Sequence, residues 1–264
     1  MIKNLFKKTL NKIGYDIVKL KLENNEKSKK TKELTYYETK TGNYYLPTDA
    51  KGDGIARTII SGEIFDKDIL DVSKGFIHEN TAVLDVGANF GQMTILLSKF
   101  LNNKGKVYSF EADDFIFSIL EKNIEANGCK NVQAVFGVVS DKNNEIHFYP
   151  EQDFERFQTY GSYGPNPNRN NGRKVKTITI DSLEIAEKIS FMKFDIQGYD
   201  LLGMRGAVET IKKNKMPIIF EFEWLFQDDL NLSFQEYVDF VLGIDYRFDK
   251  LINAQNYLIV PNKS

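Results

Sequence analysis

Acidic side chains end two apolar segments of the sequence. Asp195 closes the run Phe-Met-Lys-Phe-Asp, and Glu221 and Glu223 close the run Pro-Ile-Ile-Phe-Glu-Phe-Glu. Glu221 and Glu223 share one face of an extended chain, because successive side chains alternate. Such carboxylates remove a proton from a hydroxyl group directly, or bind a divalent cation that lowers the pKa of the hydroxyl. Asp195, Glu221 and Glu223 are therefore candidate catalytic residues and candidate ligands for magnesium, manganese or calcium.

Histidine and cysteine offer little alternative chemistry. The chain has two histidines, His78 and His147, and one cysteine, Cys129. These counts exclude a zinc site built from several such ligands and any internal disulfide. His78 precedes the first strand pattern and His147 lies in an edge-strand pattern, so a structural or solvated role is expected for both. The scarcity of histidine and cysteine favours the carboxylates as the catalytic groups.

A glycine-rich turn is the second feature of the sequence that indicates a chemical function. The segment Asp85-Val86-Gly87-Ala88-Asn89-Phe90-Gly91 joins an apolar strand pattern to a helix pattern. Such a turn lets a ligand approach the backbone at a helix N-terminus. Glu111 ends the next strand pattern about 20 residues later, where an acid accepts hydrogen bonds from ribose hydroxyls. The two features together predict a nucleoside-containing cofactor.

The identity of that cofactor follows from two positions. Asn89 stands where a dinucleotide-binding loop carries its second glycine, so the space for a pyrophosphate is lacking. The carboxylate of Asp85 suits an ammonium group and disfavours phosphates. S-adenosylmethionine is therefore expected, with a dehydrogenase-like nucleotide binder as the alternative.

Strand and helix patterns alternate around these residues. The predicted strands are 81–86, 106–110, 131–136, 191–195, 217–222, 245–248 and 257–260, and the predicted helices are 55–61, 65–77, 91–101, 114–127, 200–214 and 233–242. This alternation predicts an α/β fold with a mainly parallel seven-stranded sheet covered on both faces. The last two strands have no helix between them, so an antiparallel hairpin is expected at one edge.

Residues 1–80 are expected to form an N-terminal helical extension and lead-in to a domain at 81–264. Apolar residues recur at helical spacing in residues 1–13, with lysines on the opposite face. This helix either packs on the domain or a partner subunit, or makes at most a peripheral contact with an anionic membrane. The start lacks a signal-peptide pattern and no apolar stretch is long enough to span a bilayer, so cytoplasm is the expected location. A homo-oligomer is compatible with the sequence, which does not decide the oligomeric state.

Charge and one long loop bear on partners. The formal net charge is −2, which argues against bulk electrostatic attraction to nucleic acid, so no nucleic-acid partner is expected. Residues 151–173 are rich in Gly, Pro and Asn and predict a long loop. Its aromatic and basic residues either stack on a base or sugar and pair with phosphate, or are incidental; they are Phe154, Arg156, Phe157, Tyr160, Tyr163 and Arg169.

Three segments resemble the FkbM-family methyltransferases. They are DVGANFGQMTILLSKF, KVYSFEA and FMKFDIQGYDLLGMRGA, within about Thr81 to Phe222, and the family signatures are approximately D-x-G-A-N-x-G and K-x-D-x-E-G. The resemblance implies a Rossmann-like fold, S-adenosylmethionine as methyl donor and O-methylation in bacterial glycan or natural-product pathways. The chain departs from the pattern at Gln197, where glutamate is usual, and at Tyr199-Asp200.

The resemblance also implies a role for each cofactor-binding residue. Asp85, Gly87 and Gly91 hold the methionine end, Asn89 shapes the turn or contacts the ligand, Glu111 holds the ribose, and Gly137, Val138 and nearby Asp141 flank the adenine.

The expected function is methyl transfer to a sugar hydroxyl. The substrate would be a nucleotide-activated or glycan-linked sugar in bacterial surface polysaccharide biosynthesis, with the hydroxyl activated by Asp195, Glu221 and Glu223. The alternatives are an N-methyltransferase, an O-methyltransferase for a non-sugar small molecule, and a non-catalytic Rossmann-like binding protein.

Overall fold

The computed structural model describes residues 33–102, 104–150, 159–161, 163–165 and 170–262. Contacts divide the chain into residues 1–32 and a compact unit of residues 33–264. The predicted amphipathic helix at 1–13 lies outside the described residues, and so do Phe154, Arg156, Phe157 and Arg169 of the long loop.

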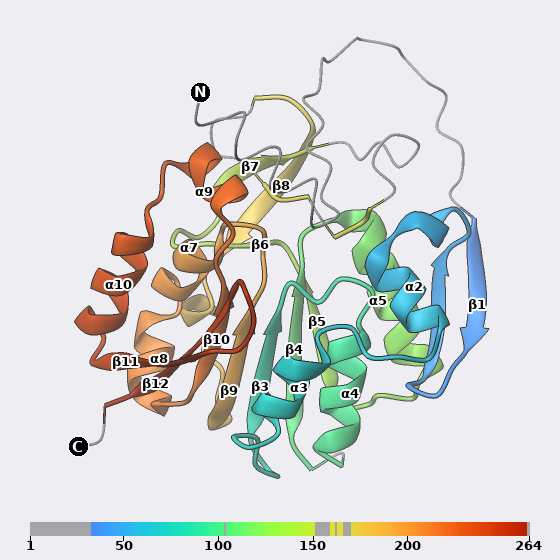
Figure 1. The fold of residues 1–264 in the computed structure, drawn as a ribbon, viewed down its shortest axis with the longest axis horizontal. Coiled ribbons are helices and arrows are strands. Elements are labelled where there is room, and N and C mark those ends of the chain that lie inside the picture. The colour runs from blue at the N-terminus through green and yellow to red at the C-terminus, as the bar shows by residue number, and fades with distance from the viewer. Residues whose placement is uncertain (1–32, 103, 151–158, 162, 166–169, 263–264) are drawn as a thin grey trace. The chain divides into compact units, whose positions relative to one another are not determined.

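A seven-stranded sheet forms the centre of the larger unit (Figure 1). Its strand order is β11-β12-β10-β9-β3-β4-β5. Neighbours from β10 to β5 run parallel, whereas β12 is antiparallel to both β10 and β11. The bounds are β3 Ala82–Val86, β4 Lys106–Glu111, β5 Val132–Phe136, β9 Ile189–Phe194, β10 Ile218–Glu221, β11 Tyr246–Leu251 and β12 Asn256–Pro261. The predicted mainly parallel sheet with an antiparallel edge hairpin is confirmed.

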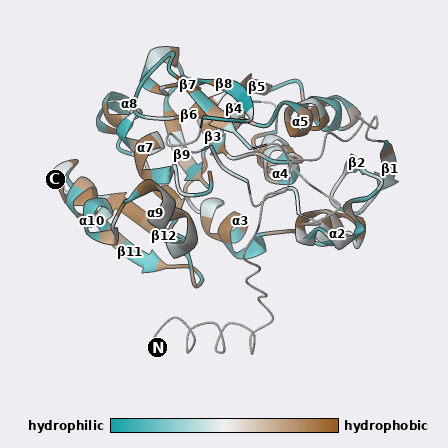
Figure 2. Cartoon of the chain, turned by 90° about the horizontal axis from the view of Figure 1, so that it is seen from above, coloured by the Kyte–Doolittle hydropathy of each residue, from teal (hydrophilic) through white to brown (hydrophobic). Residues whose placement is uncertain are grey.

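Helices cover both faces of this sheet, as Figure 2 shows from above. Their bounds are α2 Gly54–Ile60, α3 Lys67–Ser73, α4 Gln92–Phe100, α5 Asp114–Ala126, α7 Asp200–Arg205, α8 Val208–Asn214, α9 Trp224–Leu230 and α10 Phe234–Gly243. One core cluster includes Leu84 and Phe194, and a second includes Val83 and Phe191. Residues adjacent on a strand thus enter opposite clusters, because the sheet is buried on both faces.

Two helix ends show structures that their residue types favour. The backbone N–H of Ser233 donates to the side chain of Glu236 at 2.9 Å, forming the capping box of α10. Gly128, with φ of 62°, follows α5 in the left-handed conformation. Residue type is therefore consistent with where α10 begins and where α5 ends.

The predicted helix at 200–214 is wrong, because it is divided into α7 and α8. A Cβ on Gly206 would lie 2.0 Å from the carbonyl oxygen of Ser140. The backbone at this position packs directly against the segment that follows strand β6 (Val138–Val139). This close approach interrupts the helix at a residue without a side chain.

Two smaller sheets flank the main one. Strands β6, β8 (Arg173–Ile178) and β7 (Ile146–Tyr149) form one, in the order β6-β8-β7. Strands β1 (Leu34–Glu38) and β2 (Asn43–Pro47) form the other, and short 3₁₀ turns occur at Ala50–Gly52 and Asp181–Leu183. None of the helices within the described part of the chain is both long and apolar enough to cross a membrane.

The β1–β2 hairpin packs on α5 through a buried asparagine. The side-chain oxygen of Asn123 accepts from the N–H of Tyr45 at 2.6 Å, and its amide donates to the carbonyls of Tyr45 and Phe90 at 3.2 and 2.8 Å. Phe90 belongs to the glycine-rich turn. Residues 33–80 are therefore tied to the sheet domain at the turn predicted to bind the cofactor.

Replacing Asn123 by alanine tests this link. Asn123→Ala leaves three backbone groups without their partner, and we expect it to lower the free energy of unfolding by about 2–4 kcal/mol. Urea denaturation measures the effect. Glu125→Ala on the exposed side of the same helix serves as the control and should change stability by less than about 0.5 kcal/mol. Equal stability of the two variants would contradict this role of Asn123.

Candidate functional site

The predicted glycine-rich turn and the predicted acids meet at the carboxyl edge of the sheet. Strands β3 and β9 are parallel neighbours, and Asp85 pairs in register with Lys193. The backbone N–H of Asp195 donates to the carbonyl of Val86 at 2.9 Å. Strand β6 and helix α9, which follow strand ends, lie on this upper side in Figure 1. The two groups are parts of one site.

Gly87 permits this contact. Its φ is 92°, and a Cβ at this position would lie 1.9 Å from the carbonyl oxygen of Asp195. Gly91, with φ of 87°, precedes α4, and a Cβ there would lie 2.6 Å from a Leu120 methyl group. Asn89 is also left-handed, with φ of 49°. The turn therefore requires glycine at 87 and 91 for conformation and for space.

Glu111 is buried at the end of β4 and organises the turn. One carboxylate oxygen accepts the N–H of Asn89 at 3.0 Å, and the other accepts those of Ala112 and Asp113, both at 2.8 Å. Burial raises the pKa of Glu111 to about 7. The oxygen that faces Asn89 has one further lone pair available for a ligand hydroxyl.

Asp85 is fully buried and only half satisfied. One oxygen accepts from the hydroxyl of Thr94 at 2.5 Å, and the other has no hydrogen-bond partner among the described residues. Burial raises the pKa of Asp85, while the charge of Lys193 opposes that shift. A buried carboxylate oxygen without a partner is costly, and it marks a place where a cationic group of a ligand would fit.

Asp195 and Glu221 form a pair at the ends of β9 and β10. The ammonium group of Lys193 donates to Asp195 at 2.9 Å, and the amide of Gln197 lies 3.3 Å from Asp195 and 3.4 Å from Glu221. Burial would raise the pKa of Asp195, but Lys193 lowers it below its ordinary value. Burial and the charge of Asp195 raise the pKa of Glu221 to about 11. Lys193 thus favours the ionised form of Asp195, and Asp195 in turn favours the protonated form of Glu221 by raising its pKa.

Glu223 has a different partner, and the set does not fit a metal. One Glu223 oxygen accepts from the amide of Gln255 at 2.6 Å. Lys193 already supplies the positive charge beside Asp195, where a bound cation would otherwise stand. Within the described part of the chain, no group of three or more His, Cys, Asp or Glu residues is placed to hold a metal ion. The predicted divalent-cation site is not supported.

The three residues predicted to flank the adenine lie in different surroundings. The N–H of Gly137 donates to the carbonyl of Glu111 at 3.0 Å. Val138 is buried in β6 against Tyr149 and Tyr199. Asp141 is exposed and lies beside Gly206. Only the first of these is joined to the ribose-binding candidate by a hydrogen bond.

Tyr160 of the long loop contacts the glycine-rich turn. It is buried, its N–H donates to Asp53 at 2.7 Å, and its hydroxyl donates to Asp49 at 2.5 Å. Its ring lies 5.7 Å from the ring of Phe90. The predicted ligand-stacking role therefore does not hold for Tyr160, which anchors the loop to the turn instead.

No sequence pattern indicated Asp66 as a site residue, although its carboxylate interacts electrostatically with Lys193, Asp195 and Asp85. Asp200 was likewise not predicted as a site residue. It is fully buried behind Glu221, whose N–H it accepts at 3.3 Å. Asp66 lies outside the recognisable motifs, whereas Asp200 lies in the segment FMKFDIQGYDLLGMRGA, where the chain departs from the family pattern.

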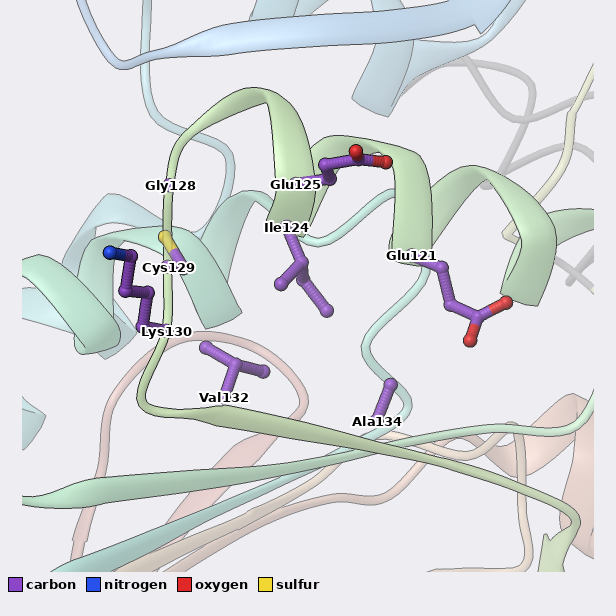
Figure 3. A pocket seen from close by; sticks show the side chains of 8 residues that line it. All are labelled: Glu121, Ile124, Glu125, Gly128, Cys129, Lys130, Val132 and Ala134. Atoms are coloured by element: carbon purple, nitrogen blue, oxygen red, sulfur yellow. The ribbon is translucent and has the colours of Figure 1, made fainter.

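A cavity of about 410 Å³ lies elsewhere, between α5 and β5 (Figure 3). Its lining residues are Glu121, Ile124, Glu125, Gly128, Cys129, Lys130, Val132 and Ala134. They belong to the amino-terminal part of β5 and the chain before it, whereas the site lies at the carboxyl ends of the strands. None of the predicted site residues lines this cavity.

Comparison with known proteins gives a family and several relatives. The family model described as "Methyltransferase FkbM domain" matches residues 85–248. A curated protein of Sulfolobus acidocaldarius, named as a cobalt-precorrin-6B C(15)-methyltransferase (decarboxylating), is 29% identical over 79 residues, which are 30% of this chain and 41% of that protein. A crystal structure of methyltransferase FkbM from Methylobacillus flagellatus has 17% identity and a TM-score of 0.44 over 70% of this chain and 44% of the other. The chain thus matches less than half the length of each of these two relatives.

One comparison corrects an expectation about partners. An rRNA methylase from Streptococcus thermophilus is similar to this chain, with 13% identity and a TM-score of 0.42 over 72% of this chain and 91% of the other. Proteins that act on RNA thus occur among those similar in fold. The expectation of no nucleic-acid partner, which rested on net charge, is therefore wrong as an exclusion.

Gly87→Ala tests the close contact between the turn and Asp195. The added methyl group would collide with the Asp195 carbonyl in a backbone conformation that alanine disfavours, so we expect a loss of about 3 kcal/mol or more in unfolding free energy. Gly54→Ala is the matched control, because nothing lies within 4 Å of the added Cβ there. Denaturant unfolding of both variants is the measurement. A Gly87→Ala protein as stable as the control would show that the turn and β9 are not in contact.

Proposed function

The chain belongs to the FkbM methyltransferase family, and we propose that it transfers a methyl group from S-adenosylmethionine to a hydroxyl of a nucleotide-activated or glycan-linked sugar. One observation carries the proposal: the backbone N–H of Asp195 donates to Val86 at the start of the glycine-rich turn, and the Asp195 carboxylate shares the amide of Gln197 with Glu221. A proton acceptor thus adjoins the place where the turn would hold a methyl donor.

The residues around the turn fit this donor. Glu111 has a lone pair for a ribose hydroxyl, and Gly87 and Gly91 give the turn the left-handed backbone with which it leads into the N-terminus of α4. Asp85 has an unpaired oxygen for the ammonium group. S-adenosylmethionine would supply an electrophilic methyl group at this edge, and the chain contributes alignment and proton removal.

Asp195 is the proposed proton acceptor. Lys193 keeps Asp195 ionised, and Gln197 fixes the orientation of its carboxylate. A substrate hydroxyl that donates to Asp195 has its oxygen lone pair directed away from that bond, toward the donor side. The hydroxyl proton becomes more acidic as the oxygen is methylated, so a carboxylate suffices to accept it.

The surroundings of Glu223 support a sugar as acceptor. Trp224 follows Glu223 directly, and its side chain is 69% exposed. Glu223 and Gln255 form a planar polar pair. An exposed aromatic ring and planar polar groups together match the apolar face and the hydroxyls of a sugar ring.

The direct test combines binding with product detection. Calorimetry should detect binding of S-adenosylhomocysteine but not of NAD. Mass spectrometry should then detect transfer of one methyl group to a member of a panel of nucleotide sugars and glycans. Methylation of RNA or of an amine tested in parallel, with all sugars unchanged, would refute the proposed acceptor.

Asp195→Asn should abolish most of the transfer. Loss of the proton acceptor should lower kcat by about 100-fold or more, while affinity for S-adenosylhomocysteine stays within about three-fold. Asp239→Asn on the exposed face of α10 makes the same change of charge and should have no effect. Wild-type turnover by Asp195→Asn would exclude the proposed base.

Chelation tests whether Lys193, rather than a metal ion, supplies the positive charge beside Asp195. Because its ammonium group already neutralises Asp195, we expect full activity after exhaustive EDTA treatment and dialysis. A loss of activity that magnesium or manganese restores would contradict this expectation.

Trp224 provides an internal probe of the acceptor side, because it is the one tryptophan of the chain. Binding of a methyl-accepting sugar nucleotide should change its fluorescence, whereas S-adenosylhomocysteine alone should not. Trp224→Ala should raise the acceptor KM about ten-fold with little change in kcat. Unchanged fluorescence at saturating acceptor would show that the sugar binds elsewhere.

A further inference from the structure

Asp66 has an unusual conformation for its position. It is the N-cap residue of α3, yet its φ is 53° and its side chain makes no hydrogen bond to the first turn of the helix. An aspartate at an N-cap ordinarily accepts from that turn. The Asp66 carboxylate therefore does not cap α3.

The segment before Asp66 is fixed beside the glycine-rich turn. Gln92, the first residue of α4, accepts the N–H of Phe65 at 2.9 Å and donates to the carbonyl of Glu63 at 2.8 Å. Gln92 is buried and directly follows Gly91. Asp66 is therefore held next to the start of α4, where the turn ends.

Asp66 also belongs to the charge group around Lys193. Its carboxylate is attracted by Lys193 and repelled by Asp195 and Asp85, and burial together with these repulsions raises its pKa to about 6. By strand alternation Asp85, Lys193 and Asp195 share the sheet face on which Ile69 and Leu70 of α3 pack with Val83 and Phe191. Three carboxylates thus interact with a single ammonium group on this face. Asp85, which is fully buried on this face, has one oxygen without a hydrogen-bond partner among the described residues. Such an excess of acceptors suits one more cation.

We propose that Asp66 and the unpaired oxygen of Asp85 together bind the ammonium group at the amino-acid end of the methyl donor. This inference depends on the proposed function for the identity of the ligand. It assigns a donor-binding role to a residue outside the region 85–248 that matches the family model. Segment 63–66 thereby forms one wall of the donor site.

Two ligands separate this role from a general effect on binding. S-adenosylhomocysteine carries the amino-acid end, whereas 5′-methylthioadenosine has the same nucleoside and a thioether but no ammonium group. Calorimetry on the full chain would compare wild type with Asp66→Asn. Asparagine tolerates the left-handed conformation as aspartate does, so the backbone should be kept.

Asp66→Asn should weaken S-adenosylhomocysteine about ten-fold and leave 5′-methylthioadenosine within about two-fold. Asp71→Asn removes one charge from the exposed part of α3 and should leave both affinities unchanged. If Asp66→Asn does not fold, Asp66→Gly is the second variant, because glycine lacks the carboxylate and also adopts the left-handed conformation.

The outcomes are distinct. Equal weakening of both ligands, or an unchanged or higher affinity of Asp66→Asn for S-adenosylhomocysteine, would overturn the role of Asp66 and leave the proposed function intact. Failure of the wild-type chain to bind either ligand would overturn both.

Discussion

The buried ammonium group of Lys193 is the interaction on which the ligand edge depends. Its side chain is 5% exposed, donates to Asp195 at 2.9 Å, and lies on β9 in register with Asp85 of β3. A charge at this depth is tolerated only where opposite charges and hydrogen bonds replace its hydration. The carboxylates on both sides of Lys193 in turn depend on it for neutralisation. The donor side and the acceptor side therefore share one buried ammonium group.

The meeting of Asp195 and Glu221 could be predicted from the sequence, because parallel strands end at the same edge of a sheet. The position of Glu223 could not be predicted in the same way. Alternation placed it on the face of Glu221, but β10 ends at Glu221, and Glu223 becomes the N-cap residue of α9. Once the strand ends, a period of two no longer determines the direction of a side chain. Glu223 accordingly pairs with Gln255 rather than with Asp195 and Glu221.

Other features lacked any local signal. The break between α7 and α8 depends on the contact of Gly206 with Ser140. The spacing of apolar residues in 200–214 does not indicate that contact. Tyr160 resembled a ligand-stacking residue because its partners, Asp49, Asp53 and Phe90, lie far away in the sequence. Local patterns predicted the fold, the resemblance identified the family, and contacts between distant segments completed the site.

The anchoring of the β1–β2 hairpin has a consequence for how the chain folds. Tyr45 is bonded to a residue 78 positions later, Asn43 to one 84 positions later, and Asp49 to one 111 positions later. During synthesis the hairpin leaves the ribosome well before any of these partners exists, and an isolated two-stranded hairpin is marginally stable at best. Contacts of such sequence separation also form slowly. The β1–β2 hairpin therefore cannot form its native contacts until later residues have been synthesised. Until then its two aromatic-rich strands remain exposed.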